Sequence, residues 1–247
     1  MKKPALLAAL GLLALAVWET VTLLHVHASA ATDADWQAAR AVVERERRPG
    51  DLIVFAPAWV DPVGRRWLGD WLTLDDVARM DEARYGRVWE LSVRGAAFGL
   101  DGEVALEEQA GAVRVRRFDR DAAGVLWDLR GRSQLLEVDY QGRRCVPIAV
   151  PGRLDAGTIP LGRTLAVRAG ISDFRNRRDN RAFAQVRVVV DGNELAQATV
   201  GSESGWVPLS AATTPGTGRL VIEATVDPNH PATPAVLSLC VAAEARQ

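Results

Sequence analysis

The chain of 247 residues is 48% hydrophobic and 25% charged, as is usual for globular proteins. Its formal net charge of -1 excludes the broadly basic surface that nucleic-acid binding needs. Only three histidines and two cysteines occur, and His230 is the only histidine after residue 27. Most metal centres and catalytic triads are therefore excluded, and we expect no cofactor, no metal ion and no nucleic-acid partner.

The first 30 residues have the form of an export signal, because two lysines precede an apolar run over residues 5–18. Two alternatives stay open for residues 1–30: an uncleaved single-pass membrane anchor, or a signal peptide cleaved near residues 28–30. Either alternative leaves residues from about 33 onward outside the cytoplasm. We therefore expect a cell-membrane protein whose bulk is periplasmic or on the cell surface, or else a secreted protein.

The next segments have the pattern of a small α/β domain over residues 33–130. Helical and strand-like patterns alternate over residues 35–47, 51–55, 72–85 and 87–93. This alternation predicts a parallel pair of strands, with Asp33 or Asp35 as the cap of the first helix. Residues 112–118 alternate between valine and arginine, which predicts an edge strand.

A second domain over residues 133–246 has the pattern of an antiparallel β-sandwich. Strands are predicted over residues 135–140, 144–150, 164–169, 184–190, 194–200, 206–209, 218–226 and 235–243. Residues 191–193 form a strong hairpin turn, and the Pro- and Gly-rich residues 151–162 and 228–234 are predicted loops. The fold class is thus a two-part α+β protein: a small α/β unit followed by a jelly-roll sandwich, after an N-terminal hydrophobic helix.

Cys145 and Cys240 are the minimum for one disulfide, and an oxidising compartment would allow it. They are 95 residues apart, in the early and late strands of the predicted sandwich, where they can be neighbours. A loop of that length makes a bridge worth roughly 4 to 5 kcal/mol. The bridge is our interpretation, and a pair of buried thiols is the alternative.

The strings LAVRAGISDF and VRVVVDGNELAQATV, followed by GSESGWVPLSAAT and GRLVIEATV, resemble galactose-binding-like jelly rolls, especially carbohydrate-binding modules of the NPCBM type. In these modules a strand ends in Gly-x-x-Asp, here Gly170 to Asp173, and the next strand runs into Asp191-Gly192. The resemblance covers about residues 135–246. It implies a jelly roll whose loops bind sugars, or a docking or structural module.

The strings DWQAARAVVERERRPGDLIVFAP and YGRVWELSV resemble the extracytoplasmic part of protein O-mannosyltransferase-like membrane glycosyltransferases, over about residues 34–95. Those enzymes carry many transmembrane helices and a membrane-facing acidic catalytic motif, whereas this chain has one apolar segment. The resemblance therefore implies an accessory role near surface glycan assembly, without the transferase activity.

Three tryptophans follow the first predicted strand, where α/β folds commonly bind ligands: Trp59, Trp67 and Trp71. Aromatic faces stack on sugar rings, so these residues are candidates for a ligand site. The alternative is that they close the core of the small α/β unit. Polar edges on the same segment come from Asp61, Arg65, Arg66 and Asp70.

The densest polar loop of the predicted sandwich covers residues 173–181. Arg175, Arg177 and Asp179 could hold sugar hydroxyls through directional hydrogen bonds. The alternative is a solvated loop with local ion pairs, and the several arginines would repel a cation.

No zinc-protease, dinucleotide or phosphate-loop motif occurs, and His230 lies in a turn-rich loop, so no catalytic residue is predicted. The sequence predicts a non-catalytic glycan-binding or accessory protein of cell-envelope glycan assembly, with an envelope glycan and the membrane as partners. One alternative is a structural docking partner of a membrane glycosyltransferase. Another is a carboxylate-based glycan hydrolase, although no spacing singles out its two carboxylates.

Overall fold

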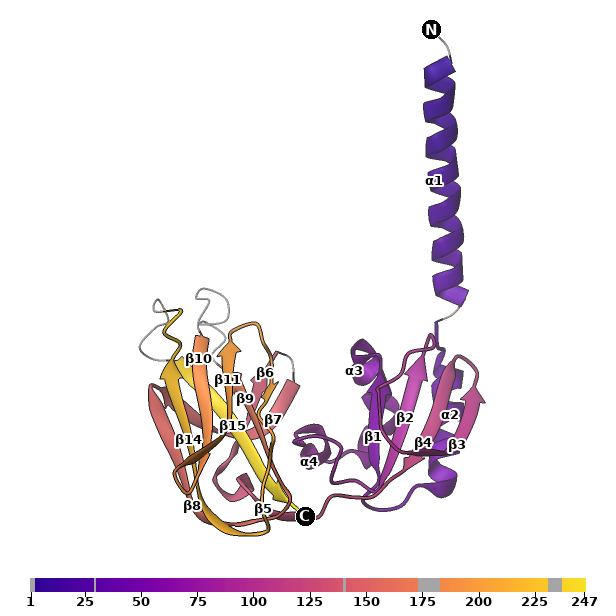
Figure 1. Cartoon of the computed structure of the whole chain (residues 1–247). Coiled ribbons are helices and arrows are strands. Elements are labelled where there is room, and N and C mark those ends of the chain that lie inside the picture. The colour runs from indigo at the N-terminus through magenta and orange to yellow at the C-terminus, as the bar shows by residue number, and fades with distance from the viewer. Residues whose placement is uncertain (1–2, 29, 140, 173–182, 231–236) are drawn as a thin grey trace. The chain divides into compact units, whose positions relative to one another are not determined.

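The structure is a computed structural model that describes residues 3–28, 30–139, 141–172, 183–230 and 237–247 (Figure 1). The chain divides into two compact units. Unit 1 comprises Met1–Leu72 and Arg87–Arg120, and unit 2 comprises Thr73–Gly86 and Asp121–Gln247. Thr73–Gly86, which the sequence pattern assigns to the α/β domain, packs with the sandwich of unit 2.

Helix α1, Lys3–Ala28, contains the predicted apolar run. Its exposed apolar side chains include Leu12, Leu13, Leu15 and Trp18. Among the residues that the structure describes, no helix is both long enough and apolar enough to cross a membrane.

Helix α2, Asp33–Glu46, covers one face of the unit 1 sheet. Its buried side chains recur at helical spacing: Trp36, Ala39, Val42 and Val43. The predicted cap is wrong, because Thr32 is the N-cap. Its hydroxyl accepts the N–H of Asp35, and the Asp35 carboxylate accepts the N–H of Thr32 in return.

The unit 1 sheet has the order β1-β2-β4-β3. Its strands are β1 Leu52–Ala56, β2 Arg87–Val93, β3 Glu103–Ala110 and β4 Val113–Asp119. The parallel pairing of β1 with β2 confirms the predicted α/β arrangement. The prediction of residues 112–118 as an edge strand is wrong, since β4 lies between β2 and β3. The edge strand next to β4 is β3, which is mostly exposed and carries three glutamates, so its sequence lacks the apolar pattern of a strand.

The connection from β1 towards β2 begins with three short helices in unit 1: η1 Ala58–Val60, α3 Asp61–Leu68 and η2 Gly69–Trp71. The chain then enters unit 2 as α4, Leu74–Val77. The predicted helix over residues 72–85 is wrong beyond α4. After Ala78 the carbonyls of Arg79 and Met80 accept hydrogen bonds from Arg143, so they do not continue a helical ladder.

Unit 2 is a β-sandwich. One sheet has the order β11-β10-β14-β8, and the other has the order β12-β9-β15-β7-β6, with β13 pairing β9 and β5 pairing β15. The strands are β5 Val125–Asp128, β6 Gln134–Val138, β7 Gln141–Val150, β8 Gly152–Leu161, β9 Thr164–Ile171, β10 Phe183–Val190, β11 Asn193–Gly201, β12 Val207–Pro208, β13 Ala211–Ala212, β14 Gly216–Val226 and β15 Leu237–Arg246. The short helix η3, Arg130–Arg132, follows β5. Inward side chains of both sheets share one buried apolar cluster, which forms the sandwich core.

The structure tests the predicted hairpin turn and one of the predicted loops of the sandwich. The turn at Asp191-Gly192 joins β10 to β11, and both residues have positive φ angles of 50° and 80°, as a tight hairpin requires. The predicted loop over residues 151–162 is wrong, because β8 occupies it. Among the described strands β8 is an edge strand that pairs with β14 alone, so it tolerates Pro160 and two glycines.

The structure joins Cys145 of β7 to Cys240 of β15 in a disulfide with a Cα–Cα distance of 5.5 Å, the pairing that the sequence analysis favours. Both cysteines are fully buried, on the face of their sheet opposite the sandwich core. They pack with Met80 and Trp206, whose indole N–H donates to the Gln141 carbonyl. The disulfide thus belongs to a second, smaller core of unit 2.

Candidate functional site

Arg40 on α2 is the centre of a polar and aromatic cluster in unit 1. Its two terminal nitrogens donate to the two carboxylate oxygens of Asp70, at 2.8 and 2.6 Å, and one of them also donates to the Trp67 carbonyl. The guanidinium carbon lies 4.2 Å from the ring centroid of Trp71. These hydrogen bonds lower the pKa of Asp70, so the carboxylate is ionised, and both of its oxygens accept hydrogen bonds from Arg40.

Arg47 completes this group, which we call the Arg40 cluster: Arg40, Arg47, Trp67, Asp70 and Trp71. Arg47 donates to the Trp71 carbonyl at 3.4 Å, and its guanidinium lies 5.3 Å from the Trp71 ring. The Trp67 indole packs partly against the unit 1 core, and its N–H has no hydrogen-bond partner among the described residues. The cluster therefore places two half-buried indole rings, two guanidinium groups and the exposed Asp70 carboxylate side by side, while the Trp67 indole N–H itself is buried.

The structure brings Trp67 and Trp71 together but not Trp59. Trp59 on η1 is 60% exposed, and its ring lies 5.5 Å from the guanidinium of Arg94, which follows β2. The predicted packing role describes Trp67 and Trp71 in part, because both are half-buried and contribute to the apolar cluster of unit 1. Trp59 does not belong to that core.

The position of this segment depends on a close approach between α3 and β1 at Gly64. A β-carbon at this position would overlap the ring of Phe55, which is buried under the helix. We expect Gly64→Ala to lower the free energy of unfolding by about 1 to 3 kcal/mol, as overpacking of a core does. Urea unfolding of the full chain measures the difference.

Gly69 provides the matched control, because a β-carbon there meets no atom within 4 Å. Gly69→Ala should leave stability within about 0.5 kcal/mol of the wild type. Equal stability of the two variants would contradict the tight packing of α3 on Phe55.

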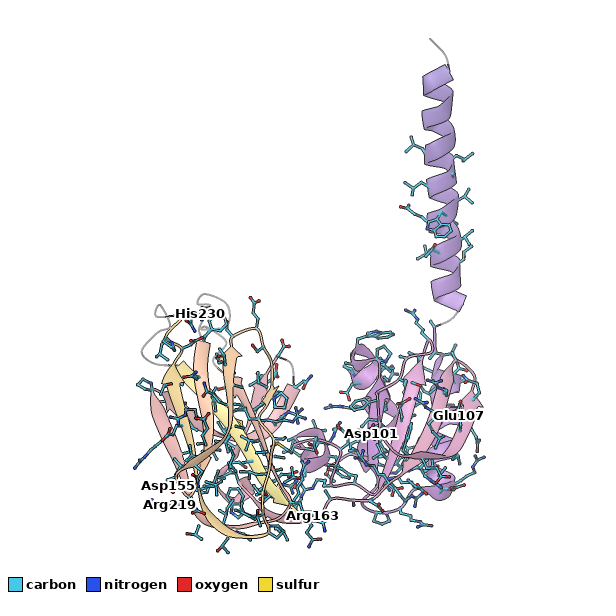
Figure 2. All side chains as sticks on the ribbon, in the orientation of Figure 1. Asp101, Glu107, Asp155, Arg163, Arg219 and His230 are labelled. Atoms are coloured by element: carbon cyan, nitrogen blue, oxygen red, sulfur yellow. A yellow bond between two sulfur atoms is a disulfide. The ribbon has the colours of Figure 1, made fainter. Side chains whose placement is uncertain are left out.

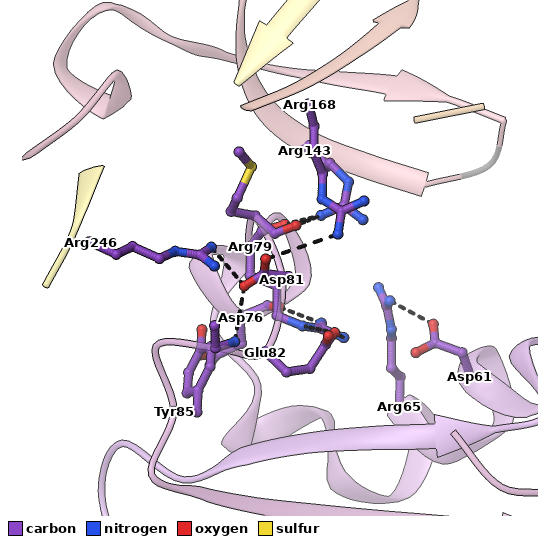
Figure 3. A network of polar contacts seen from close by, with 12 residues as sticks. Asp61, Arg65, Asp76, Arg79, Asp81, Glu82, Tyr85, Arg143, Arg168 and Arg246 are labelled. Carbon is purple, nitrogen blue, oxygen red and sulfur yellow. Dashed lines mark hydrogen bonds and ion pairs between the residues drawn. The ribbon is translucent and has the colours of Figure 1, made fainter. Parts of the chain in front are cut away.

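A buried ion network holds Thr73–Gly86 on the sandwich of unit 2 (Figure 3). Arg246 donates to Asp81 at 2.8 Å and to Glu244 at 2.7 Å. Burial raises the pKa of Asp81, but the N–H of Ala83 and the charges of Arg246 and Arg168 outweigh this effect and hold the pKa below its usual value. Asp81 is therefore ionised at neutral pH.

Arg143 holds the same segment by its backbone. It donates to the carbonyls of Arg79, at 2.6 Å, and of Met80. Burial, together with the positive charges of Arg168 and Arg79, lowers the pKa of Arg143 to about 10. Figure 3 also shows a separate ion pair of unit 1, Arg65 with Asp61 at 2.6 Å.

The structure also brings together a pair of carboxylates that sequence spacing did not single out. Glu244 on β15 lies directly opposite Asp128 on β5, and both line a small cavity of about 30 Å³. Burial raises the pKa of Asp128. This cavity is large enough for one water molecule and too small for a sugar ring, so the pair does not form a hydrolase cleft.

The remaining predicted residues give less information. Arg175, Arg177 and Asp179 lie outside the described residues. The Nδ1–H of His230 (labelled in Figure 2) donates to the Asp227 carboxylate at 2.9 Å. The imidazole ring stacks on Phe183, with ring centroids 3.8 Å apart. Within the described ranges, no group of three or more His, Cys, Asp or Glu side chains is placed to hold a metal ion.

Sequence reasoning missed Arg40 and Arg47 as members of the site. A signal for Arg40 was present, since it lies four residues after Trp36 and three before Val43, on the apolar face of α2. An arginine on that face needs a partner for its charge, and Asp70 provides it. The partner itself could not be found from spacing, because it lies 30 residues further along the chain.

Comparison with known proteins gives no family for this chain. No known protein family and no curated protein matches the sequence. The resemblance of residues 34–95 to O-mannosyltransferase-like enzymes therefore has no support from them.

Several of the solved structures that resemble the chain contain carbohydrate-binding modules. One contains the second family 51 module, in complex with GlcNAc, and INT domains of Clostridium perfringens ZmpB, with 10% identity, 51% of this chain and 28% of that chain covered, and a TM-score of 0.34. A family 6 module of Cellvibrio mixtus lichenase 5A, in complex with cellotriose, has 11% identity and a TM-score of 0.32. The match covers 50% of this chain and 98% of that chain. A family 51 module of Clostridium perfringens, in complex with methyl-galactose, has 8% identity and a TM-score of 0.33. The match covers 57% of this chain and 94% of that chain.

The chain spans only 28% of the first of these structures. Identities and TM-scores this low carry no argument about function. The solved structures thus show which proteins the chain is similar to, and the function has to be argued from its own residues.

Proposed function

We propose that this protein is a non-catalytic, extracytoplasmic glycan-binding protein whose ligand site is the Arg40 cluster. The observation that carries the proposal is the Asp70 carboxylate, 56% exposed, held in a bidentate pair by an arginine that stacks on Trp71. Sugars are recognised by fixed hydrogen-bond donors and acceptors beside an aromatic surface, and this cluster supplies all three. A fixed carboxylate also needs little reordering when a hydroxyl binds to it.

The extracytoplasmic setting is part of the proposal. Two features support it: the signal-like residues 1–30 and the disulfide between Cys145 and Cys240, which persists in oxidising compartments. A role in cell-envelope glycan assembly, with the chain held at the cell membrane or secreted, extends the same proposal. A membrane glycosyltransferase as docking partner stays a prediction from the sequence.

The test is a binding measurement with the full chain and a panel of envelope glycans. We expect Asp70→Asn to weaken the affinity about tenfold or more, because a hydrogen bond to a charged group is lost. Trp71→Leu should weaken it as well, since Arg40 then loses the ring that orients it. Isothermal titration calorimetry gives the affinities.

Asp155→Asn is the matched control. Asp155 pairs with Arg219 in unit 2 at 2.5 Å, so the same charge is removed far along the chain from the Arg40 cluster. Its affinity should equal that of the wild type. A folded wild-type sample that binds no glycan of the panel would overturn the proposal.

A further inference from the structure

The short helices after β1 carry an exposed face that neither the fold nor the Arg40 cluster uses. Along η1 and α3 the exposed side chains recur at helical spacing: Trp59, Pro62, Val63 and Arg66. We call them the Trp59 face. The opposite side of the same helices is buried through Val60, Gly64 and Leu68. The Trp59 face is therefore a fixed surface, held in place by the packing beneath it.

The composition of this face is apolar at its centre and cationic around it. Trp59 is 60% exposed and Val63 is 43% exposed. Arg94 lies over the Trp59 ring, and Arg66 lies 5.6 Å from the Trp67 ring. The one carboxylate of α3, Asp61, is paired with Arg65 at 2.6 Å. Tryptophan surrounded by arginine is the composition that proteins place at the headgroup region of anionic lipids.

The Trp59 face also lies at the edge of unit 1 where the chain arrives from α1. The turn between β3 and β4 contacts the first turn of α2, because a β-carbon on Gly111 would overlap the Asp35 carboxylate. That turn is beside the carboxyl end of β2, since Val113 pairs with Val93. The parallel strand β1 ends at the same edge, three residues before Trp59.

Only residues 29–32 separate α1 from α2, and four residues reach at most about 14 Å. The described side chains of α1 include exposed leucines and valines and Trp18, and lipid is the most favourable surrounding for such a helix. This holds for a helix that lies in the headgroup region as much as for one that enters the acyl chains. Any lipid surface that takes up α1 is thus within reach of the Trp59 face.

We propose that the Trp59 face binds an anionic lipid surface, with Trp59 and Val63 in the headgroup region and Arg66 on a lipid phosphate. Unit 1 is then held against the membrane and does not float at the end of its linker. The proposal does not depend on glycan binding, because the Arg40 cluster and the Trp59 face share no residue.

The test uses the full chain reconstituted with vesicles of phosphatidylcholine that contain 0 to 40% phosphatidylglycerol. Both native cysteines are in the disulfide, so a nitroxide on Val63→Cys reports on one position. We expect oxygen to reach this label and a water-soluble nickel reagent to be excluded when phosphatidylglycerol is present. Arg66→Gln should shift the equilibrium of the shielded state about fivefold towards exposure, as loss of one arginine near an anionic surface does.

The matched control is a label on Glu44→Cys, an exposed position on α2. It should stay open to the nickel reagent in every vesicle. A Val63 label that stays open in vesicles carrying the chain would overturn the proposal. So would shielding that is already complete in vesicles of phosphatidylcholine alone, because anionic lipid would then not be what the face binds.

Discussion

Replacing both cysteines, as Cys145→Ala with Cys240→Ala, is expected to lower the free energy of unfolding of unit 2 by about 4 to 5 kcal/mol. The bridge closes a loop of 95 residues, and removing it frees the unfolded chain. Typical domains are stable by only about 5 to 15 kcal/mol, so the loss is large. Urea unfolding followed by circular dichroism and tryptophan fluorescence measures it.

Reduction of the wild type supplies the control, because it removes the same cross-link without changing a side chain's size. The reduced wild type and the double variant should unfold at similar urea concentrations. Identical midpoints for the oxidised and reduced wild type would contradict the expected contribution of the bridge.

The second large effect is expected for Arg246→Met. Arg246 is 8% exposed and compensates two carboxylates, Glu244 and Asp81. Without Arg246 both carboxylates stay buried with less opposing charge, which lowers the free energy of unfolding by about 3 to 5 kcal/mol. Because Asp81 is held to Arg246, Thr73–Gly86 should also lose protection, which hydrogen exchange at Ala83 detects.

The pH dependence of this effect has a definite sign. The pKa of Asp81 is lowered in the folded protein, so its contribution to stability is complete above the ordinary carboxyl pKa, about 4. That contribution is lost as the pH falls through the folded pKa. The difference between wild type and Arg246→Met should therefore be full at pH 7 and shrink in acid.

Arg219→Met is the control for charge removal, since the Arg219–Asp155 pair lies on the surface (Figure 2). It should change stability little. The double variant Arg246→Met, Glu244→Leu should recover part of the loss, because no uncompensated carboxylate then remains on β15. A single Arg246→Met variant as stable as Arg219→Met would refute the role of the network.

Local sequence patterns predict the elements in which side chains alternate clearly between core and solvent. Helix α2 has buried residues at helical spacing, and β10 alternates strictly between buried and half-exposed residues, so both are found at nearly their true bounds. The sequence pattern misses strand β8. As an edge strand it forms backbone hydrogen bonds with a neighbour on one side, so it accepts Pro160. The pattern fails where tertiary pairing, not local preference, makes the strand.

The candidate site shows the same division. The segment with Trp59, Trp67 and Trp71 is visible in the sequence because tryptophan after a strand is informative by itself. The sequence does not show that Trp67 and Trp71 are half-buried while Trp59 is exposed. That difference depends on the contact with Arg40, which lies on another helix. Each cysteine, in contrast, has one possible partner because the chain has two, and the bridge then depends only on β7 and β15 bringing them together.

The connection from β1 to β2 includes Thr73–Gly86, a part of unit 2, and so the chain passes between the two units three times. No single cut of the polypeptide therefore releases both units intact. A fragment that starts at residue 121 would lack Met80 and Asp81, which cover one face of its own sheet. During evolution neither unit could be exchanged, duplicated or lost by a simple fusion of gene segments, which ties their histories together.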